Sequence, residues 1–266
     1  LMNLQTLDLT FNNLNGNIPP EIGNLVSLSA LYLSSNNLSG AIPENIGTGD
    51  LLNLTVLDIS SNSISGSIPE MTSLTKLVEL DLSDNELTDN SKSKINQLFN
   101  LEEVLLNKNR FDTLINFTPL IKDGFLRELN VADNSLIFED IQPNITEGSD
   151  IDFTYSPQEK INEMERHTML NGDSITIFTV ISGKGNEYQW YKDNEIIDQT
   201  ANESSYTIAQ FTKAKAGTFT CLVTNPAVPD LVLERNPVYI IEYQGSHLPV
   251  PESDSLALVA LYNSTD

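Results

Sequence analysis

The eleven residues 77–87, LVELDLSDNEL, decide the fold of this chain. Leucine occupies the first, fourth, sixth and eleventh positions of this stretch, and asparagine occupies the ninth. Six copies of the spacing, with conservative replacements, start at Leu4, Leu28, Leu54, Leu77, Leu101 and Leu126, in steps of 24, 26, 23, 24 and 25 residues. Such a period indicates stacked coils, in which each repeat buries its apolar side chains against its neighbours.

The spacing matches the leucine-rich-repeat template, L-x-x-L-x-L-x-x-N-x-L. Three copies continue with G-x-I-P, at Gly16, Gly40 and Gly66, an extension that resembles the subtype common in plant receptors and also found in bacterial surface proteins. We therefore predict an α/β leucine-rich-repeat solenoid over residues 1–140, with six repeats and a parallel concave sheet. The six asparagines are expected to be buried and to hydrogen-bond the adjacent coil. Phe138, Ile141 and the strand that follows are expected to cover the sixth repeat.

Four side chains around each predicted strand should face the concave surface. At these 24 positions the sequence has eight acids and one base, a net charge of −7. The candidate ligand-binding residues are Tyr32, Asp58, Glu79, Asp81, Glu103, Leu105, Lys108 and Glu128. Aspartate is also part of the repeat consensus, so simple solubility is a second explanation for the aspartates, but it does not explain the glutamates. A negatively charged groove would suit a cationic or polyhydroxylated partner.

The formal charge of the chain is −23, from 14 basic and 37 acidic residues. Such a chain is poorly suited to a phosphate backbone or an anionic membrane surface, so neither nucleic-acid binding nor membrane insertion is predicted. One cysteine and two histidines leave little material for metal or histidine-dependent chemistry. No nucleophile, base and orienting group are spaced recognisably, and no calcium-loop motif occurs. We therefore predict no enzyme activity, no cofactor and no metal site.

The repeat rhythm stops after Asn134, and the sequence then predicts a connector over 141–154 and an all-β domain over 155–243. Strands are predicted at 174–180, 188–193, 205–208 and 216–225. The segments QWYKD (189–193) and AGTFTC (216–221) resemble strands C and F of an immunoglobulin-like sandwich. This resemblance implies that Trp190 is the core tryptophan and that Cys221 is the second cysteine of the fold.

The sandwich departs from the usual immunoglobulin pattern in two ways. The partner cysteine is absent, with Thr179 or Phe178 in its place, so Cys221 should be a buried free thiol packed near Trp190. Phe219 occupies the position of the tyrosine corner, which removes the hydroxyl that usually bonds to the backbone. Both changes predict a sandwich with fewer crosslinks than usual.

Residues 244–266 are predicted to form a linker followed by a short C-terminal helix, with Ser253 or Asp254 as its N-cap. The helix resembles the start of a capping helix for a second leucine-rich-repeat array, and a helix packed on the sandwich is the alternative. Because residue 1 falls inside a repeat, we expect the sequence to be an internal fragment of a longer protein.

The combination of domains resembles large surface or secreted leucine-rich-repeat proteins of Bacteroidetes-type bacteria. That resemblance implies a non-enzymatic binding or adhesion module at the cell surface or outside the cell, which recognises a protein or glycan through the concave face. A non-catalytic scaffold of a secreted multidomain enzyme is one alternative. A plant-type receptor ectodomain is another, and the six N-x-S/T sequons, which also arise by chance in an asparagine-rich chain, would suit it.

Overall fold

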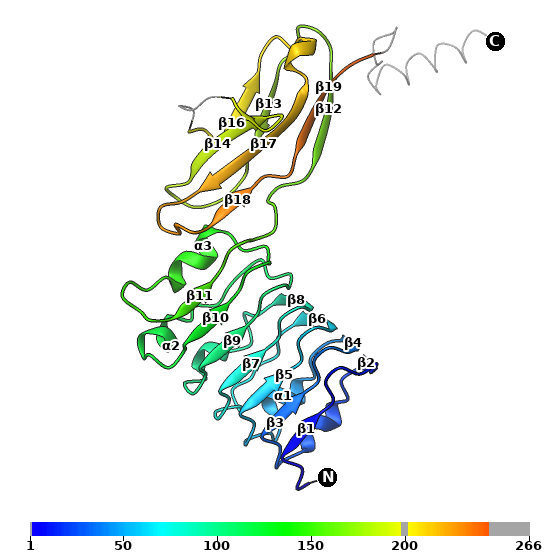
Figure 1. Cartoon of the computed structure of the whole chain (residues 1–266), viewed down its shortest axis with the longest axis vertical. Coiled ribbons are helices and arrows are strands. Elements are labelled where there is room, and N and C mark those ends of the chain that lie inside the picture. Colours follow the sequence, from blue (N-terminus) through cyan, green and yellow to red (C-terminus); the bar gives the residue numbers. More distant parts are fainter. Residues whose placement is uncertain (1, 198–201, 245–266) are drawn as a thin grey trace, which may run out of the picture.

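The computed structural model describes residues 2–197 and 202–244. Figure 1 shows the repeat coils as a curved stack, blue at the first repeat and green at the last, with the sandwich in yellow and orange beyond its last coil. The predicted order of an α/β solenoid followed by an all-β sandwich is confirmed. The tail helix predicted within 244–266 lies outside the described residues.

The concave sheet is parallel, and its strands follow the order β1-β3-β5-β7-β9-β10-β11. The strand bounds are β1 Thr6–Asp8, β3 Ala30–Tyr32, β5 Val56–Asp58, β7 Glu79–Asp81, β9 Glu103–Leu105, β10 Glu128–Asn130 and β11 Asp152–Thr154. The middle residue of each strand points inward, and Leu31, Leu57, Leu80, Val104 and Leu129 are fully buried. The residues on either side of it point to the concave surface, because successive side chains of a strand face opposite ways.

A second parallel sheet and short helices complete the coils. The strands are β2 Asn15–Asn17, β4 Asn37–Gly40, β6 Ser63–Ser67 and β8 Glu86–Asp89. The helices are η1 Pro20–Asn24, α1 Glu44–Thr48, η2 Ile95–Gln97, α2 Thr118–Lys122, α3 Phe138–Ile141 and η3 Gln142–Asn144. The glycines of the G-x-I-P extension, Gly16, Gly40 and Gly66, have φ of +80°, +77° and +83°. This left-handed conformation explains why glycine is used there.

The asparagine that recurs once in each repeat builds a hydrogen-bond ladder between coils. Asn85 accepts a bond from the Ile64 backbone N–H (2.9 Å) and donates from Nδ2 to the Ile59 carbonyl (3.1 Å), both in the preceding coil. Asn36, Asn62, Asn109 and Asn134 make the same two kinds of contact. Asn12 has no coil before it among the described residues and is exposed, which limits its bonds to the Leu9 and Thr10 carbonyls.

The sheet has one strand more than the six predicted. Strand β11 lies in the segment 141–154, for which the sequence predicts a connector, and it pairs in parallel with β10. Gln158 takes the place of the ladder asparagine, because its Oε1 accepts from the Leu136 N–H and its Nε2 donates to the Val131 carbonyl. The solenoid therefore continues for a seventh, degenerate coil, in which Phe153, Tyr155 and Gln158 replace the usual leucines and asparagine.

The sandwich consists of two sheets. The larger has the order β12-β19-β17-β14-β15, with β18 also paired to β17, and the smaller joins β13 to β16. The bounds are β12 Glu165–Met169, β13 Ile175–Phe178, β14 Glu187–Lys192, β15 Glu195–Ile196, β16 Ser205–Ile208, η4 Lys213–Lys215, β17 Gly217–Thr224, β18 Val232–Glu234 and β19 Val238–Glu242. Each of the four predicted strands is present.

The centre of the sandwich has the predicted composition. Cys221 is a buried free thiol and lies directly opposite Trp190 on the neighbouring strand. Thr179 is 2% exposed whereas Phe178 is 54% exposed, so Thr179 is the residue that replaces the partner cysteine in the core. Burial raises the pKa of the Cys221 thiol, and the Thr179 hydroxyl opposes that rise. The phenyl ring of Phe219 is buried at the tyrosine-corner position.

Arg235 is fully buried and links the two sheets of the sandwich. Its Nε donates to the Phe178 carbonyl on β13 (2.8 Å), and its guanidinium also pairs with Glu165 on β12. Burial raises the pKa of the Glu165 carboxyl, but the bonds from His167 and Arg235 outweigh it, so the net pKa is lowered. The arginine therefore crosslinks the sheets where the usual disulfide is missing.

Several polar contacts attach the sandwich to the last coil of the solenoid. The Tyr155 hydroxyl donates to Asp230 (3.3 Å), and the Ser182 hydroxyl donates to Glu139 at α3. The Glu159 N–H donates to the Asn134 carbonyl (2.6 Å), so the chain leaves the ladder and enters the sandwich without a free spacer. Across residues 2–197 and 202–244, no helix has the length and apolar character to cross a membrane.

Candidate binding site on the concave sheet

The parallel register of the concave sheet brings four acidic side chains into one line. Glu79 is paired with Glu103, Glu103 with Glu128, and Glu128 with Asp152. Neighbouring strands of a sheet are about 4.8 Å apart, so these residues form a continuous row, here called the acidic column. Three of the predicted ligand-binding residues thus come together. Asp152 is a fourth member that sequence reasoning missed.

The carboxylates of the acidic column are not neutralised by the solenoid. Within the described part of the chain, no hydrogen bond or ion pair involves the side chain of Glu79, Glu103 or Glu128. The pKa of the Glu103 carboxyl is raised, first by burial and then by repulsion from Glu128, Glu79 and Asp81. The column is therefore a site of unbalanced negative charge that a cation would stabilise.

The aspartates of the next column have a different, structural role. The Oδ1 atom of Asp81 accepts from the Ser83 N–H (2.9 Å) and the Ser83 hydroxyl (2.6 Å), and Asp58 makes the same two bonds with Ser60 at 3.0 and 2.7 Å. The Ser34 hydroxyl also donates to Asp58 (2.6 Å). Burial is the main reason that the pKa of Asp81 is raised, although its bonds with Ser83 oppose the rise. These two carboxylates stabilise the turns that follow β5 and β7.

Of the remaining predicted residues, Tyr32 and Leu105 lie in the row that contains Asp58 and Asp81, and Lys108 lies outside it. Tyr32 pairs with Asp58, and Leu105 lies between Asp81 and Asn130 in the same row. Lys108 has φ of +54° and lies beyond the strand, in the turn. Left-handed residues with φ between 52° and 55° occupy the same position in the other five repeats, namely Phe11, Ser35, Ser61, Asp84 and Asp133. Lys108 is therefore at the rim of the surface rather than on its floor.

A detectable signal existed for the missed residue Asp152. It lies 24 residues after Glu128, which is one repeat length, and the segment 151–155 alternates apolar and polar residues as a strand does. The template failed there because aspartate, phenylalanine and tyrosine (Asp150, Phe153 and Tyr155) occupy the positions of its first three leucines.

The solenoid and sandwich contain no converging metal-ligand set among the residues that the structure describes, since no three His, Cys, Asp or Glu side chains are placed to hold one ion. The members of the acidic column are arranged in a row instead of around a point. Their arrangement suits an extended cationic group more than a single ion.

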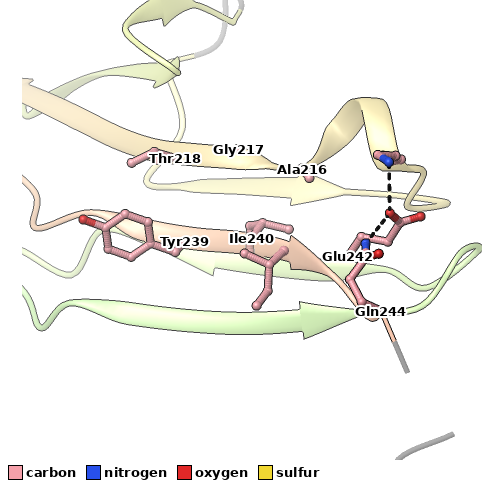
Figure 2. Close-up of a pocket in the computed structure, with 9 residues that line it drawn as sticks. Ala216, Gly217, Thr218, Tyr239, Ile240, Glu242 and Gln244 are labelled. Carbon is pink, nitrogen blue, oxygen red and sulfur yellow. Dashed lines mark hydrogen bonds and ion pairs between the residues drawn. The ribbon is translucent and has the colours of Figure 1, made fainter. Parts of the chain in front are cut away.

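A hollow of about 570 Å³ lies on the sandwich. Figure 2 shows the residues that line it. Tyr239 and Thr218 line one part of it, and Glu242, Gln244 and Lys213 line another. Glu242 accepts from the Gln244 amide (2.7 Å) and lies 3.9 Å from the Lys213 ammonium. Because these polar groups already contact one another, this hollow lacks the unbalanced charge of the concave sheet.

The architecture is that of a leucine-rich-repeat solenoid followed by an immunoglobulin-like sandwich. In agreement with this, residues 52–94 match the family model described as Leucine Rich repeats (2 copies), and residues 3–25 and 27–48 match that of the Leucine Rich Repeat. Residues 160–241 match the model of the Immunoglobulin domain. Both domain types suggest a protein-binding module and are typically non-catalytic.

Solved structures with partial similarity include leucine-rich-repeat ectodomains from Arabidopsis. The receptor kinase HAESA, in complex with the peptide hormone IDA and the co-receptor SERK1, is 33% identical over 50% of this chain and 22% of its own, with a TM-score of 0.47. The ectodomain of GASSHO1/SCHENGEN3, in complex with CASPARIAN STRIP INTEGRITY FACTOR 2, is 31% identical over 53% of this chain and 17% of its own, with a TM-score of 0.47. The ectodomain of SOBIR1 is 37% identical over 46% of this chain and 64% of its own, with a TM-score of 0.42.

The chain spans less than two thirds of each of these three proteins. Their TM-scores are all below 0.5, so the fold assignment rests on the strand register and the family models. A search of characterised protein sequences found no match.

Proposed function

We propose that this chain is a non-enzymatic binding module whose concave sheet recognises a basic segment of a protein partner. The observation that supports this function is the in-register acidic column of Glu79, Glu103, Glu128 and Asp152. Like charges directly opposite each other on neighbouring strands are destabilising, and each such pair costs about 0.2–1 kcal/mol. A lysine or arginine side chain placed between two carboxylates would remove that repulsion.

The ligand-binding residues that we propose overlap with the eight expected from the sequence but are not the same set. Glu79, Glu103 and Glu128 are its centre, Asp152 extends it, and Tyr32, Leu105 and Lys108 lie at its borders. Asp58 and Asp81 are committed to bonds with serines, so their substitution would confuse loss of binding with loss of the turn. A test of the site should therefore change glutamates.

The test is fluorescence anisotropy with a labelled Lys- and Arg-rich peptide of about ten residues, at about 0.05 M and 0.3 M NaCl. Binding to the unmodified chain should weaken as salt rises, because the contact is electrostatic and solvent-accessible. The variant E103K/E128K should lower the affinity at least about tenfold, a change of about 1.4 kcal/mol. E21K/E44K makes the same change of net charge on exposed residues at η1 and α1, and should lower it far less.

Equal losses in both variants would show that only net charge matters, and the concave site would then be wrong. A labelled glycan, measured in the same assay, separates the two ligand classes. Glycan binding to the column, without peptide binding, would replace the basic segment with a polyhydroxylated ligand.

We also infer an extracellular or cell-surface location, supported by the two domain types, and an adhesion role of the kind implied by the resemblance to Bacteroidetes-type surface proteins. Two alternative functions make different predictions for the longer protein. A neighbouring hydrolase domain would favour a scaffold in a secreted enzyme. A transmembrane helix followed by a kinase would favour a plant-type receptor ectodomain.

A further inference from the structure

One flank of the solenoid combines exposed apolar side chains with almost no net charge. It consists of the four-residue segments that precede the concave strands of repeats two to six, namely 26–29, 52–55, 75–78, 99–102 and 124–127, and is here called the flank. The third residue of each segment is a buried leucine of the repeat core. The other residues lie at the solenoid surface.

Hydrogen bonds hold the five segments side by side. The Thr55 N–H donates to the Ser29 carbonyl (2.8 Å), the Val78 N–H to Thr55 (2.8 Å), the Glu102 N–H to Val78 (2.9 Å) and the Arg127 N–H to Glu102 (2.8 Å). Side chains repeat the pattern, because the Asn53 amide donates to the Val26 carbonyl (3.1 Å) and the Asn100 amide to that of Thr75 (2.6 Å).

The first residues of the first four segments, Val26, Leu52, Thr75 and Phe99, therefore form a row across the coils. Phe125 is the second residue of the fifth segment, and it borders a hollow of about 400 Å³ on the flank together with Lys76, Val78, Asn100 and Glu102. Leu52, Phe99 and Phe125 are 54%, 51% and 50% exposed. Large apolar side chains that recur at one face of a soluble protein indicate an interaction surface.

The charge of the flank separates it from the rest of the molecule. Its 20 residues include two bases, Lys76 and Arg127, and one acid, Glu102, which gives a net charge of +1 in a chain of −23. Glu102 already pairs with Arg127 (3.3 Å). Two copies of a chain with a net charge of −23 repel each other when their acidic faces approach. Contact through the flank brings together only one carboxylate from each copy, that of Glu102.

We propose that two copies of this chain associate through the flank, apolar row against apolar row. A two-fold arrangement is self-complementary, because the same patch serves both subunits. With the axis near Thr75, Leu52 of one copy meets Phe99 of the other. This association is separate from ligand binding by the acidic column, since the column faces the concave side.

The size of the row sets the strength of the association. Five coils at about 4.8 Å spacing give a row about 19 Å long. A standard interface buries about 800 Å² per partner. A row of this length, together with its polar border, buries less than that area. A dissociation constant in the micromolar range or above is therefore expected, so the dimer forms reversibly.

Sedimentation velocity of the 266-residue chain tests this proposal over about 1–300 µM protein, at about 0.05 M and 0.5 M NaCl. The mass should rise from 29.4 kDa towards twice that value with concentration, and more so at high salt, which screens the repulsion between the acidic chains. Binding at the acidic column has the opposite salt dependence, so failure of one proposal is distinguishable from failure of the other.

The variant L52D/F99D should raise the dissociation constant of the dimer at least about tenfold. F11D is a control for one aspartate at an exposed apolar position, because Phe11 is 85% exposed but lies outside the flank, and it should change that constant less than about twofold. The thermal unfolding of both variants should stay close to that of the parent chain, since all three side chains are at the surface.

Crosslinking tests the geometry of the dimer. T75C should form an intermolecular disulfide under mild oxidation, whereas Cys221 is buried and should not react. A monomer at every concentration and salt would overturn the proposal. So would a dimer that survives L52D/F99D or that T75C fails to crosslink.

Discussion

Glu103 lies directly opposite Glu128 on the neighbouring parallel strand, and neither carboxylate has a partner within the described chain. Glu79 lies on the other side of Glu103 in the same register. Repulsion of this kind is tolerated in a folded protein only at a cost to its stability. The acidic column is therefore the place where stability and ligand binding have opposite requirements.

Replacement of Glu103 by glutamine should stabilise the solenoid by about 1 kcal/mol at neutral pH, because it removes two like-charge neighbours. Burial and those neighbours raise the pKa of Glu103 in the folded chain, so the folded state holds the proton more tightly than the unfolded state does. The advantage of E103Q should be full at neutral pH. It should shrink as the pH falls through the raised pKa towards the ordinary value of 4.5.

Urea unfolding followed by circular dichroism, at several pH values between neutral and about 4, measures this difference. A gap between E103Q and the parent that stays constant, or widens, as the pH falls would contradict the assignment of like-charge repulsion.

Loss of a ladder asparagine should destabilise the solenoid according to its position. N85A removes the acceptor for the Ile64 N–H and the donor to the Ile59 carbonyl, which leaves buried backbone groups unpaired and should cost about 1–3 kcal/mol. N12A removes bonds only to the Leu9 and Thr10 carbonyls at an exposed site, and should cost less. Urea unfolding of both variants gives the comparison. Equal costs would show that contact between coils is not what the ladder contributes.

Substitution of Arg235 by methionine should destabilise the sandwich by about 3 kcal/mol. The change leaves the Phe178 carbonyl and the Glu165 carboxylate without their buried donor. The single tryptophan, Trp190, is buried in the sandwich, so its fluorescence during urea unfolding reports on this domain. R166M changes an exposed arginine one residue from Glu165 and should shift the midpoint little. Similar effects of the two substitutions would refute the crosslink between sheets.

Thr179 is the position at which a disulfide could be restored. T179C should oxidise with Cys221 and stabilise the sandwich by about 4 kcal/mol, the value expected for a closed loop of about 43 residues. Thiol titration in denaturant should find no free thiol in oxidised T179C. It should find two in V180C, whose new side chain points to solvent at a position where valine is 75% exposed. Free thiols in both variants would show that residues 179 and 221 are not suitably placed.

Much of the solenoid could be predicted because its information is local and repeated. The spacing of Leu77, Leu80, Leu82 and Asn85 specifies one coil, and six copies specify their stacking. The sandwich could be predicted from fewer residues, chiefly Trp190 and Cys221, which lie opposite each other as expected. The seventh coil was missed because Phe153, Tyr155 and Gln158 occupy the template positions with other residue types.

Within repeats two to six, the sequence by itself determined which leucines are buried and which acids point to the concave surface, since the repeat period assigns each residue to a face. Only the tertiary structure decided that the carboxylates of two adjacent columns differ. Asp81 is bonded to Ser83 within its own turn, whereas Glu103 meets residues more than twenty positions away that carry the same charge. Likewise, the bond from Arg235 to Phe178 joins strands that no local pattern connects. Periodicity specifies the direction in which a side chain points. The groups that the side chain contacts come from neighbouring coils and sheets, and those contacts decide whether its charge is neutralised.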